Sequence, residues 1–225
     1  MHCDILFDLD GTLIDSSPGI LASFARIMAA HGLQAAVPLD AALIGPPLAV
    51  TLKGISGIED EAALTRLAEA FKQDYDTAGY RDTLAFDGVA EGLTQLAGAG
   101  TRLFIVTNKR LVPTLKILDA LDLARHFAGV HTRDETVPMA PSKAAVAQRV
   151  IARYGIDSAR ACFVGDSNED AAAARENGLR FIHATYGYGA ASIQDHSDAV
   201  LDHFARLPDF VAALLRESCA APARP

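Results

Sequence analysis

The feature that most constrains the fold is a regular alternation of short apolar runs and amphipathic segments between residues 89 and 184. The apolar runs have the length of strands, and Gly100, Gly155 and Gly178 stand where the amphipathic segments should end as helices. Such alternation is typical of parallel strands joined by right-handed crossovers. We therefore predict an α/β fold with a doubly wound, Rossmann-like parallel sheet. The predicted helices cover residues 89–99, 113–121, 142–154 and 169–177, and the predicted strands cover 102–107, 129–132, 161–164 and 180–184.

A segment without strand patterns separates this alternating part from the first strand. Ile5-Leu6-Phe7 is an apolar run that stops at Asp8, which is typical of a buried central strand. Between residues 16 and 82 we find only helical patterns, the longest over 59–78. We therefore predict an α/β core of residues 1–15 and 83–225, with an all-helical domain of residues 16–82 inserted after the first strand.

Composition and charge exclude several classes of protein. The chain has 225 residues, of which 50% are hydrophobic and 21% charged, so it should be globular rather than disordered. Its net charge of −8 offers no basic surface to nucleic acid or anionic membranes. Three cysteines without framework spacing argue against a disulfide scaffold or a zinc site. With no export signal or membrane-length apolar run in view, we expect a cytoplasmic protein, either monomeric or homodimeric.

Polar side chains follow three of the predicted strands at the point where each strand ends. Ligands of open parallel sheets bind at the carboxyl ends of the strands, so these side chains should share one edge. They are Asp8 and Asp10 after the first strand, Thr107 and Asn108 after the second, and Asp166 and Asp170 after a later one, with Lys143 at a helix start between the last two pairs.

These residue types indicate phosphoryl chemistry. Three or four carboxylates cannot all stay ionised in a low-dielectric cleft unless a cation screens them. Oxygen ligands without histidine or cysteine favour Mg²⁺ over zinc. A lysine and a hydroxyl can hold phosphate oxygens, a carboxylate can attack phosphorus, and a second carboxylate can move the protons.

The motifs FDLDGTLID (7–15), VTN (106–108), Lys143 and GDSNED (165–170), in that order, resemble the haloacid dehalogenase superfamily of phosphohydrolases. The helical segment after the first motif is similar to its branch with an inserted helical cap, the phosphoglycolate phosphatase-like enzymes. The resemblance implies that Asp8 is the nucleophile and Asp10 the general acid/base. An acid two residues after the nucleophile separates the phosphatases of this superfamily from its dehalogenases and phosphonate-cleaving relatives.

The same resemblance implies the remaining site residues. Thr107 and Lys143 would bind the transferring phosphoryl group. The implied Mg²⁺ ligands are Asp8, the backbone carbonyl of Asp10, and Asp166, with Asp170 a direct or outer ligand. Asn108 would be a supporting polar contact, Gly11 would allow a tight turn, and Pro47, in the loop Gly45-Pro46-Pro47, would help to read the substrate.

Several of these assignments have alternatives. Many relatives carry the lysine directly before a proline, whereas Ala144 follows Lys143 here, so Lys109 is a rival phosphate ligand. Asp170 could simply lie in the first turn of a helix, where a carboxylate is favourable. Asn108 could be a helix N-cap. The loop at Pro47 could be a helix stop and restart, and Tyr186-Gly187-Tyr188-Gly189 could be either a rim of the site or a plain turn.

Together the motifs predict a Mg²⁺-dependent phosphatase acting on a small phosphorylated metabolite, with 2-phosphoglycolate as the leading substrate. A phosphomutase of a sugar phosphate, a pyrophosphatase or a nucleotidase would use the same groups. From another class, a regulatory protein that binds a phosphorylated ligand without turnover remains an alternative.

Overall fold

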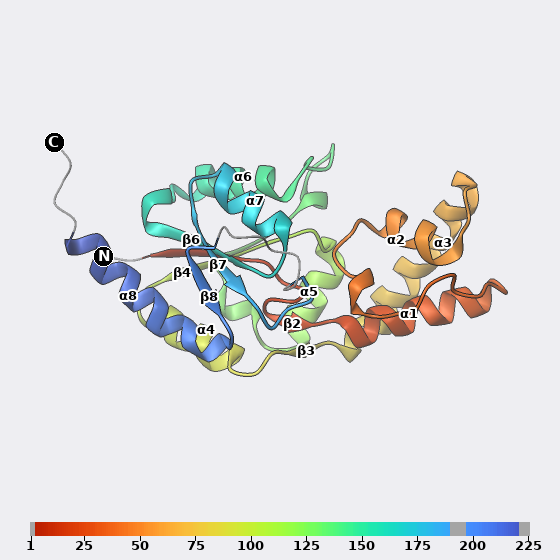
Figure 1. Ribbon diagram of the computed structural model, residues 1–225, viewed down its shortest axis with the longest axis horizontal. Helices are drawn as coiled ribbons and strands as arrows, with labels where there is room; N and C mark the ends of the chain where they lie inside the picture. The colour runs from red at the N-terminus through yellow and green to blue at the C-terminus, as the bar shows by residue number, and fades with distance from the viewer. Residues whose placement is uncertain (1–2, 190–196, 221–225) are drawn as a thin grey trace.

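The centre of the protein is a six-stranded parallel sheet with helices on both faces (Figure 1). The computed structural model describes residues 3–189 and 197–220. The strand order is β5-β4-β1-β6-β7-β8, which confirms the predicted doubly wound fold. Because the order reverses at β1, the carboxyl end of that strand faces the crevice where ligands of such folds bind. The strands are β1 (Asp4–Phe7), β4 (Arg102–Thr107), β5 (Gly129–Thr132), β6 (Ala161–Gly165), β7 (Arg180–Ala184) and β8 (Ala199–Leu201).

Both faces of the sheet are buried, which explains why its strands are continuous apolar runs. Ile5 and Phe7 of β1 belong to the hydrophobic cluster on one face, with α4 (Val89–Gly98), α5 (Leu111–Ala120) and α8 (Leu207–Ala220). Leu6 belongs to the cluster on the other face, with α6 (Lys143–Tyr154) and α7 (Asn168–Glu176). No described helix is both long and apolar enough to cross a membrane.

Three helices between the first strand and α4 form a separate block with its own hydrophobic cluster, away from the sheet (Figure 1). They are α1 (Ser17–Ala30), α2 (Leu48–Ser56) and α3 (Glu61–Thr77). The chain enters and leaves this helical block through a short antiparallel ribbon of β2 (Ile14–Asp15) and β3 (Leu84–Ala85). The division into a core of 1–15 and 83–225 and a cap of 16–82 stays a prediction.

Some elements differ from the predicted ones. Strand β8 and the ribbon of β2 and β3 were not predicted, because runs of two or three residues carry no periodic signal. Helix α8 was not predicted either. Helix α1 begins at Ser17, with Ser16 as its N-cap. Short 3-10 turns lie at Ala41–Leu43, Gly79–Asp82, Ala124–His126, Arg133–Glu135, Ser158–Arg160 and Phe204–Arg206.

Two helical glycines of the block provide a matched test of its packing. A β-carbon at Gly19 in α1 would clash with the backbone carbonyl of Gly79, whereas a β-carbon at Gly54 in α2 would meet nothing within 4 Å. Alanine at either site improves helix propensity by roughly 1 kcal/mol. We expect Gly54→Ala to raise the free energy of unfolding by about 0.5–1 kcal/mol, and Gly19→Ala to lower it by about 1–3 kcal/mol because α1 must move. Denaturant unfolding of both variants measures this, and stabilisation by Gly19→Ala would contradict the packing.

Candidate active site

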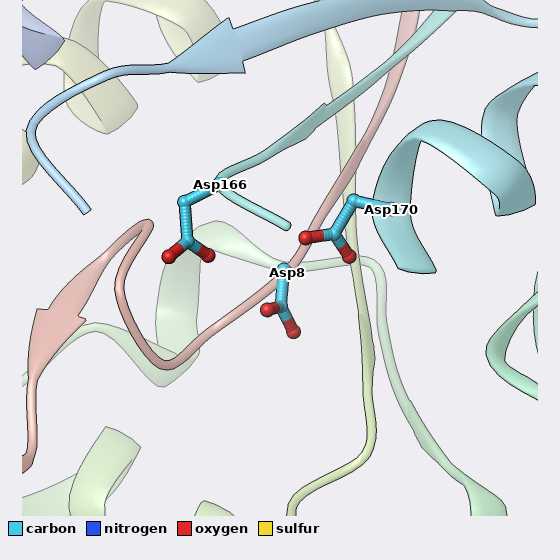
Figure 2. Close-up of side chains that lie close together, drawn as sticks. All are labelled: Asp8, Asp166 and Asp170. Atoms are coloured by element: carbon cyan, nitrogen blue, oxygen red, sulfur yellow. The ribbon is translucent and has the colours of Figure 1, made fainter. Parts of the chain in front are cut away.

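Three buried aspartates meet at the carboxyl edge of the sheet (Figure 2). Asp8 follows β1, Asp166 follows β6, and Asp170 lies in the first turn of α7. Each offers a carboxylate oxygen within 4.8 Å of the others. Strands β1 and β6 are neighbours, with Phe7 opposite Val164, so Asp8 and Asp166 leave the sheet side by side. The structure therefore brings together three of the acids that the sequence predicts at one site.

Lys143 is the cation of this cluster. It begins helix α6, whose N-cap Ser142 accepts a hydrogen bond from the backbone of Ala145. Its Nζ lies 3.0 Å from Asp8 Oδ1 and 2.6 Å from Asp170 Oδ1. The predicted lysine is thus in direct contact with the predicted nucleophile.

Asp170 lies in the first turn of a helix, as one of its two alternatives has it, and also contacts Lys143. Its Oδ2 accepts hydrogen bonds from the backbone N–H of Ser167 at 2.9 Å and from the Ser167 hydroxyl at 2.6 Å, completing a capping box at the start of α7. Its Oδ1 accepts from Lys143. Both oxygens are therefore engaged, one by the helix cap and the other by the lysine.

The cluster carries more negative than positive charge. Burial raises the pKa of Asp8 well above its usual range. Attraction to Lys143 lowers this pKa, and repulsion by Asp170 and Asp166 raises it. Burial and the nearby Asp170 raise the pKa of Asp166 to about 6. Burial also disfavours the Lys143 ammonium, but Asp170 and Asp8 outweigh it and hold the pKa of Lys143 above its usual value. Three carboxylates facing one ammonium, all oxygen donors, fit a hard divalent cation.

Asp10 is held by a different lysine. Lys109 Nζ lies 2.8 Å from Asp10 Oδ1, and the Ser16 hydroxyl donates to the same oxygen. Lys109 also donates to the Tyr75 hydroxyl of helix α3 at 2.9 Å. Burial disfavours the Lys109 ammonium, but the Asp10 carboxylate outweighs it, so the pKa of Lys109 lies above its usual value. Both lysines therefore lie in the site: Lys109 pairs with Asp10, and Lys143 pairs with Asp8 and Asp170.

The turn after β1 and the loop after β7 enclose Asp166. Gly11 has a φ of +82°, and a β-carbon there would clash with the Asp166 carboxylate. Thr12 Oγ1 donates to Asp166 Oδ1 at 3.3 Å, and the backbone N–H of Gly189 donates to Oδ2 at 3.0 Å. A β-carbon at Gly187 would also clash with this side chain. The loop of tyrosines and glycines is therefore a rim of the site rather than a remote turn.

The remaining predicted residues lie in different surroundings. Thr107 is buried at the end of β4, next to β1, and its Oγ1 accepts from the backbone N–H of Lys109 at 3.2 Å. Asn108 does not cap a helix, since the N-cap of α5 is Arg110, and its amide donates to Glu169. Pro47 is exposed and is the N-cap of α2. Its carbonyl accepts hydrogen bonds from the backbone N–H groups of Val50 and Thr51, as in the helix-restart alternative.

On the Asp10 side of the site, sequence reasoning missed Ser16 and Tyr75, which contact Asp10 and Lys109. Ser16 follows the first motif directly, so its position in the sequence offered a signal. Tyr75 belongs to the apolar stripe of α3, and nothing in that pattern distinguishes it from a core residue. Its contact with Lys109 depends on how α3 lies against the start of α5.

Comparison with known proteins assigns the family. The sequence model of the haloacid dehalogenase-like hydrolases matches residues 5–184, which include all the acids described above. The chain belongs to this family. This agrees with the resemblance of its motifs.

Individual relatives of this haloacid dehalogenase-like hydrolase cover nearly its whole length. A phosphoglycolate phosphatase of Yersinia pseudotuberculosis is 33% identical over 210 residues, 90% of each chain. The tyrosine-protein kinase PtkA of Mycobacterium tuberculosis is 32% identical over 218 residues, 93% of this chain and 72% of the relative. The crystal structure of a predicted phosphoglycolate phosphatase from Haemophilus somnus superposes with a TM-score of 0.81 at 25% identity, covering 93% of this chain and 97% of that one.

The excess negative charge of the aspartate cluster can be tested by measuring the stability of the metal-free protein. Asp166→Asn removes one of the three repelling carboxylates, so at pH 7 in the presence of a chelator it should raise the free energy of unfolding by roughly 1–3 kcal/mol. Mg²⁺ should stabilise the parent by about 2–3 kcal/mol at 100 times its Kd and stabilise Asp166→Asn much less. The exposed Asp119→Asn is the control and should change neither value. A parent protein that Mg²⁺ does not stabilise would contradict the site.

The raised pKa of Asp166 predicts how the stability of the metal-free protein depends on pH. The pKa of Asp166 is raised from 3.8 to about 6, so its proton stabilises the folded state below pH 4, and that contribution is lost as pH rises through 6. We expect the unfolding midpoint of the chelator-treated protein to fall between pH 4 and pH 7. Because Mg²⁺ needs deprotonated ligands, its stabilising effect should be larger at pH 7 than at pH 5. A midpoint that rises over this range in the parent, relative to Asp166→Asn, would count against the assignment.

Proposed function

We propose that this protein is a Mg²⁺-dependent phosphatase that hydrolyses a small phosphomonoester, with 2-phosphoglycolate as the leading substrate, through a phospho-aspartate on Asp8. One observation carries the proposal: Asp8 and Asp10 lie at the same strand end but are held by different lysines, Lys143 and Lys109. A nucleophile and a proton carrier need such separate surroundings. The relatives named phosphoglycolate phosphatase support the choice of substrate.

The residues divide the reaction into two displacements. In the first, an Asp8 oxygen bonds to phosphorus while the bond to the leaving oxygen breaks and Asp10 gives that oxygen a proton. In the second, Asp10 takes a proton from water, the water oxygen bonds to phosphorus, and the bond to Asp8 breaks. Lys143 and Thr107 hold the oxygens of the transferring group throughout. The products are an alcohol and inorganic phosphate.

The residues that would hold Mg²⁺ are Asp8, Asp166 and the backbone carbonyl of Asp10. When bound, the ion neutralises charge on the phosphoryl oxygens and allows two carboxylates to stay ionised near them. Asp170 has both oxygens engaged by Ser167 and Lys143, so we assign it the task of orienting Lys143. This assignment favours an outer position for Asp170 over direct contact with the ion.

Asp8→Asn tests the nucleophile. The amide does not attack phosphorus, so kcat should fall by roughly 10³-fold or more, while the exposed Asp119→Asn should match the parent. Acid quenching with substrate labelled in the phosphoryl group should leave label on the parent protein and none on Asp8→Asn. Hydrolysis by Asp8→Asn at the parent rate would overturn the mechanism.

Product analysis tests the acceptor. Phosphoryl transfer to an acceptor other than water is the second candidate function, because one relative at 32% identity is named a tyrosine-protein kinase. A panel of phosphomonoesters ranked by kcat/KM, with Mg²⁺ and with chelator, should place 2-phosphoglycolate first and release one phosphate per alcohol formed. An isomerised sugar phosphate would indicate a mutase. Tight binding without any turnover would indicate the regulatory alternative.

A further inference from the structure

Lys109 connects the active site to the helical block. Its side chain is only 6% exposed, and it has two partners from different parts of the molecule. One is Asp10 in the turn after β1, and the other is the hydroxyl of Tyr75 near the end of α3. Its ammonium also lies 4.8 Å from the centre of the Tyr75 ring, within the range of a cation–π contact. A buried ammonium with a carboxylate on one side and an aromatic hydroxyl on the other fixes the distance between the two.

The contact belongs to a larger junction between α3 and α5. Arg110 donates two hydrogen bonds to the Asp76 carboxylate at 2.6 and 2.8 Å, and Lys116 donates to the Asp76 backbone carbonyl at 2.6 Å. Three cationic side chains from one short stretch therefore meet the end of α3. Of these three, Lys109 is the one whose ammonium also contacts an active-site carboxylate.

The donors on Asp10 define which of its oxygens is available. The hydroxyl of Ser16 and the ammonium of Lys109 both bind Oδ1. Protonation of the oxygen that already accepts two hydrogen bonds would break one of them, so Oδ2 is the oxygen that carries a transferable proton. Loss of the ammonium would leave the carboxylate on a single hydrogen bond and free it to rotate. General acids and bases depend on such placement within hydrogen-bond reach of the proton they move.

We propose that Lys109 is a positioning residue that, through Tyr75, makes proton transfer by Asp10 depend on the seating of helix α3 against α5. The proposal rests on the proposed function, in which Asp10 protonates the leaving oxygen. When α3 lies against α5, Lys109 is held from both sides and aims Oδ2 of Asp10. When α3 moves away, Lys109 loses the Tyr75 hydroxyl, and the carboxylate loses its fixed orientation.

The test uses two substrates that differ in their need for an acid. The leaving group of an alkyl phosphate such as 2-phosphoglycolate is an alkoxide, which needs protonation. The leaving group of p-nitrophenyl phosphate is a stabilised phenolate, which needs little. The value of kcat/KM reports the first displacement for both. Lys109→Met keeps the aliphatic stem and removes the charge, so it should lower kcat/KM for the alkyl phosphate by at least about 10-fold more than for the aryl phosphate. In the Asp10→Asn background the same substitution should add little, because the acid is already gone.

Two further variants make the result specific. Tyr75→Phe keeps the ring and removes the hydroxyl, so it should show the same leaving-group dependence with a smaller loss. Its effect also decides the matter if Lys109→Met does not fold, as judged by the thermal unfolding midpoint. Lys72→Met removes an exposed ion pair with Glu69 that lies within α3 and reaches neither α5 nor Asp10, so it should leave the ratio of the two kcat/KM values at the parent level.

Each outcome is decisive. Equal losses on both substrates in Lys109→Met and Tyr75→Phe would show that the contact only stabilises the fold, and would overturn the inference. A parent-like ratio in both variants would do the same. A parent protein inactive on every phosphomonoester would overturn the proposed function itself, and with it this inference. That result is visible before any variant is made.

Discussion

The site depends on the mutual repulsion of carboxylates that the sheet forces into one buried corner. Asp8, Asp166 and Asp170 are each less than a tenth exposed, so water cannot screen them, and a single ammonium cannot neutralise them. The folded state tolerates this arrangement because the surrounding sheet and helices bury enough apolar surface to hold the acids in place. This unscreened negative charge suits the corner to the divalent cation that the proposed function requires.

Parallel topology explains how residues so far apart in sequence reach that corner. Every strand of a parallel sheet points its carboxyl end to the same edge, and β1 lies between β4 and β6. Thr107, Asp8 and Asp166 therefore emerge side by side from three adjacent strands. The close approach of the turns completes the arrangement, because Gly11 and Gly187 have no β-carbon where the Asp166 carboxylate must lie.

The same topology explains which parts of the structure could be predicted from sequence. Strands β4, β5 and β7 begin and end where predicted, because a strand buried on both faces is an apolar run with abrupt ends. The cluster of acids with Lys143 was predictable because it follows from the strand ends and from the helix starts at the same edge of the sheet. The contact of Lys109 with Tyr75 was not, because it requires the orientation of α3 relative to α5. Periodicity identifies the apolar stripe of α3 but not the neighbour that its last turn meets.

The two lysines show how one strand end can serve two kinds of chemistry. Lys143 is held by Asp8 and Asp170, all within the core, so its position does not depend on the helical block. Lys109 is held by Asp10 on one side and by α3 on the other, so its position does. A nucleophile must keep its orientation whether or not a substrate is enclosed, whereas a proton should be delivered only after water has been excluded. In the proposed mechanism, in which Asp8 is the nucleophile and Asp10 the proton carrier, tying Asp10 and not Asp8 to the helical block meets both requirements through one buried side chain, that of Lys109.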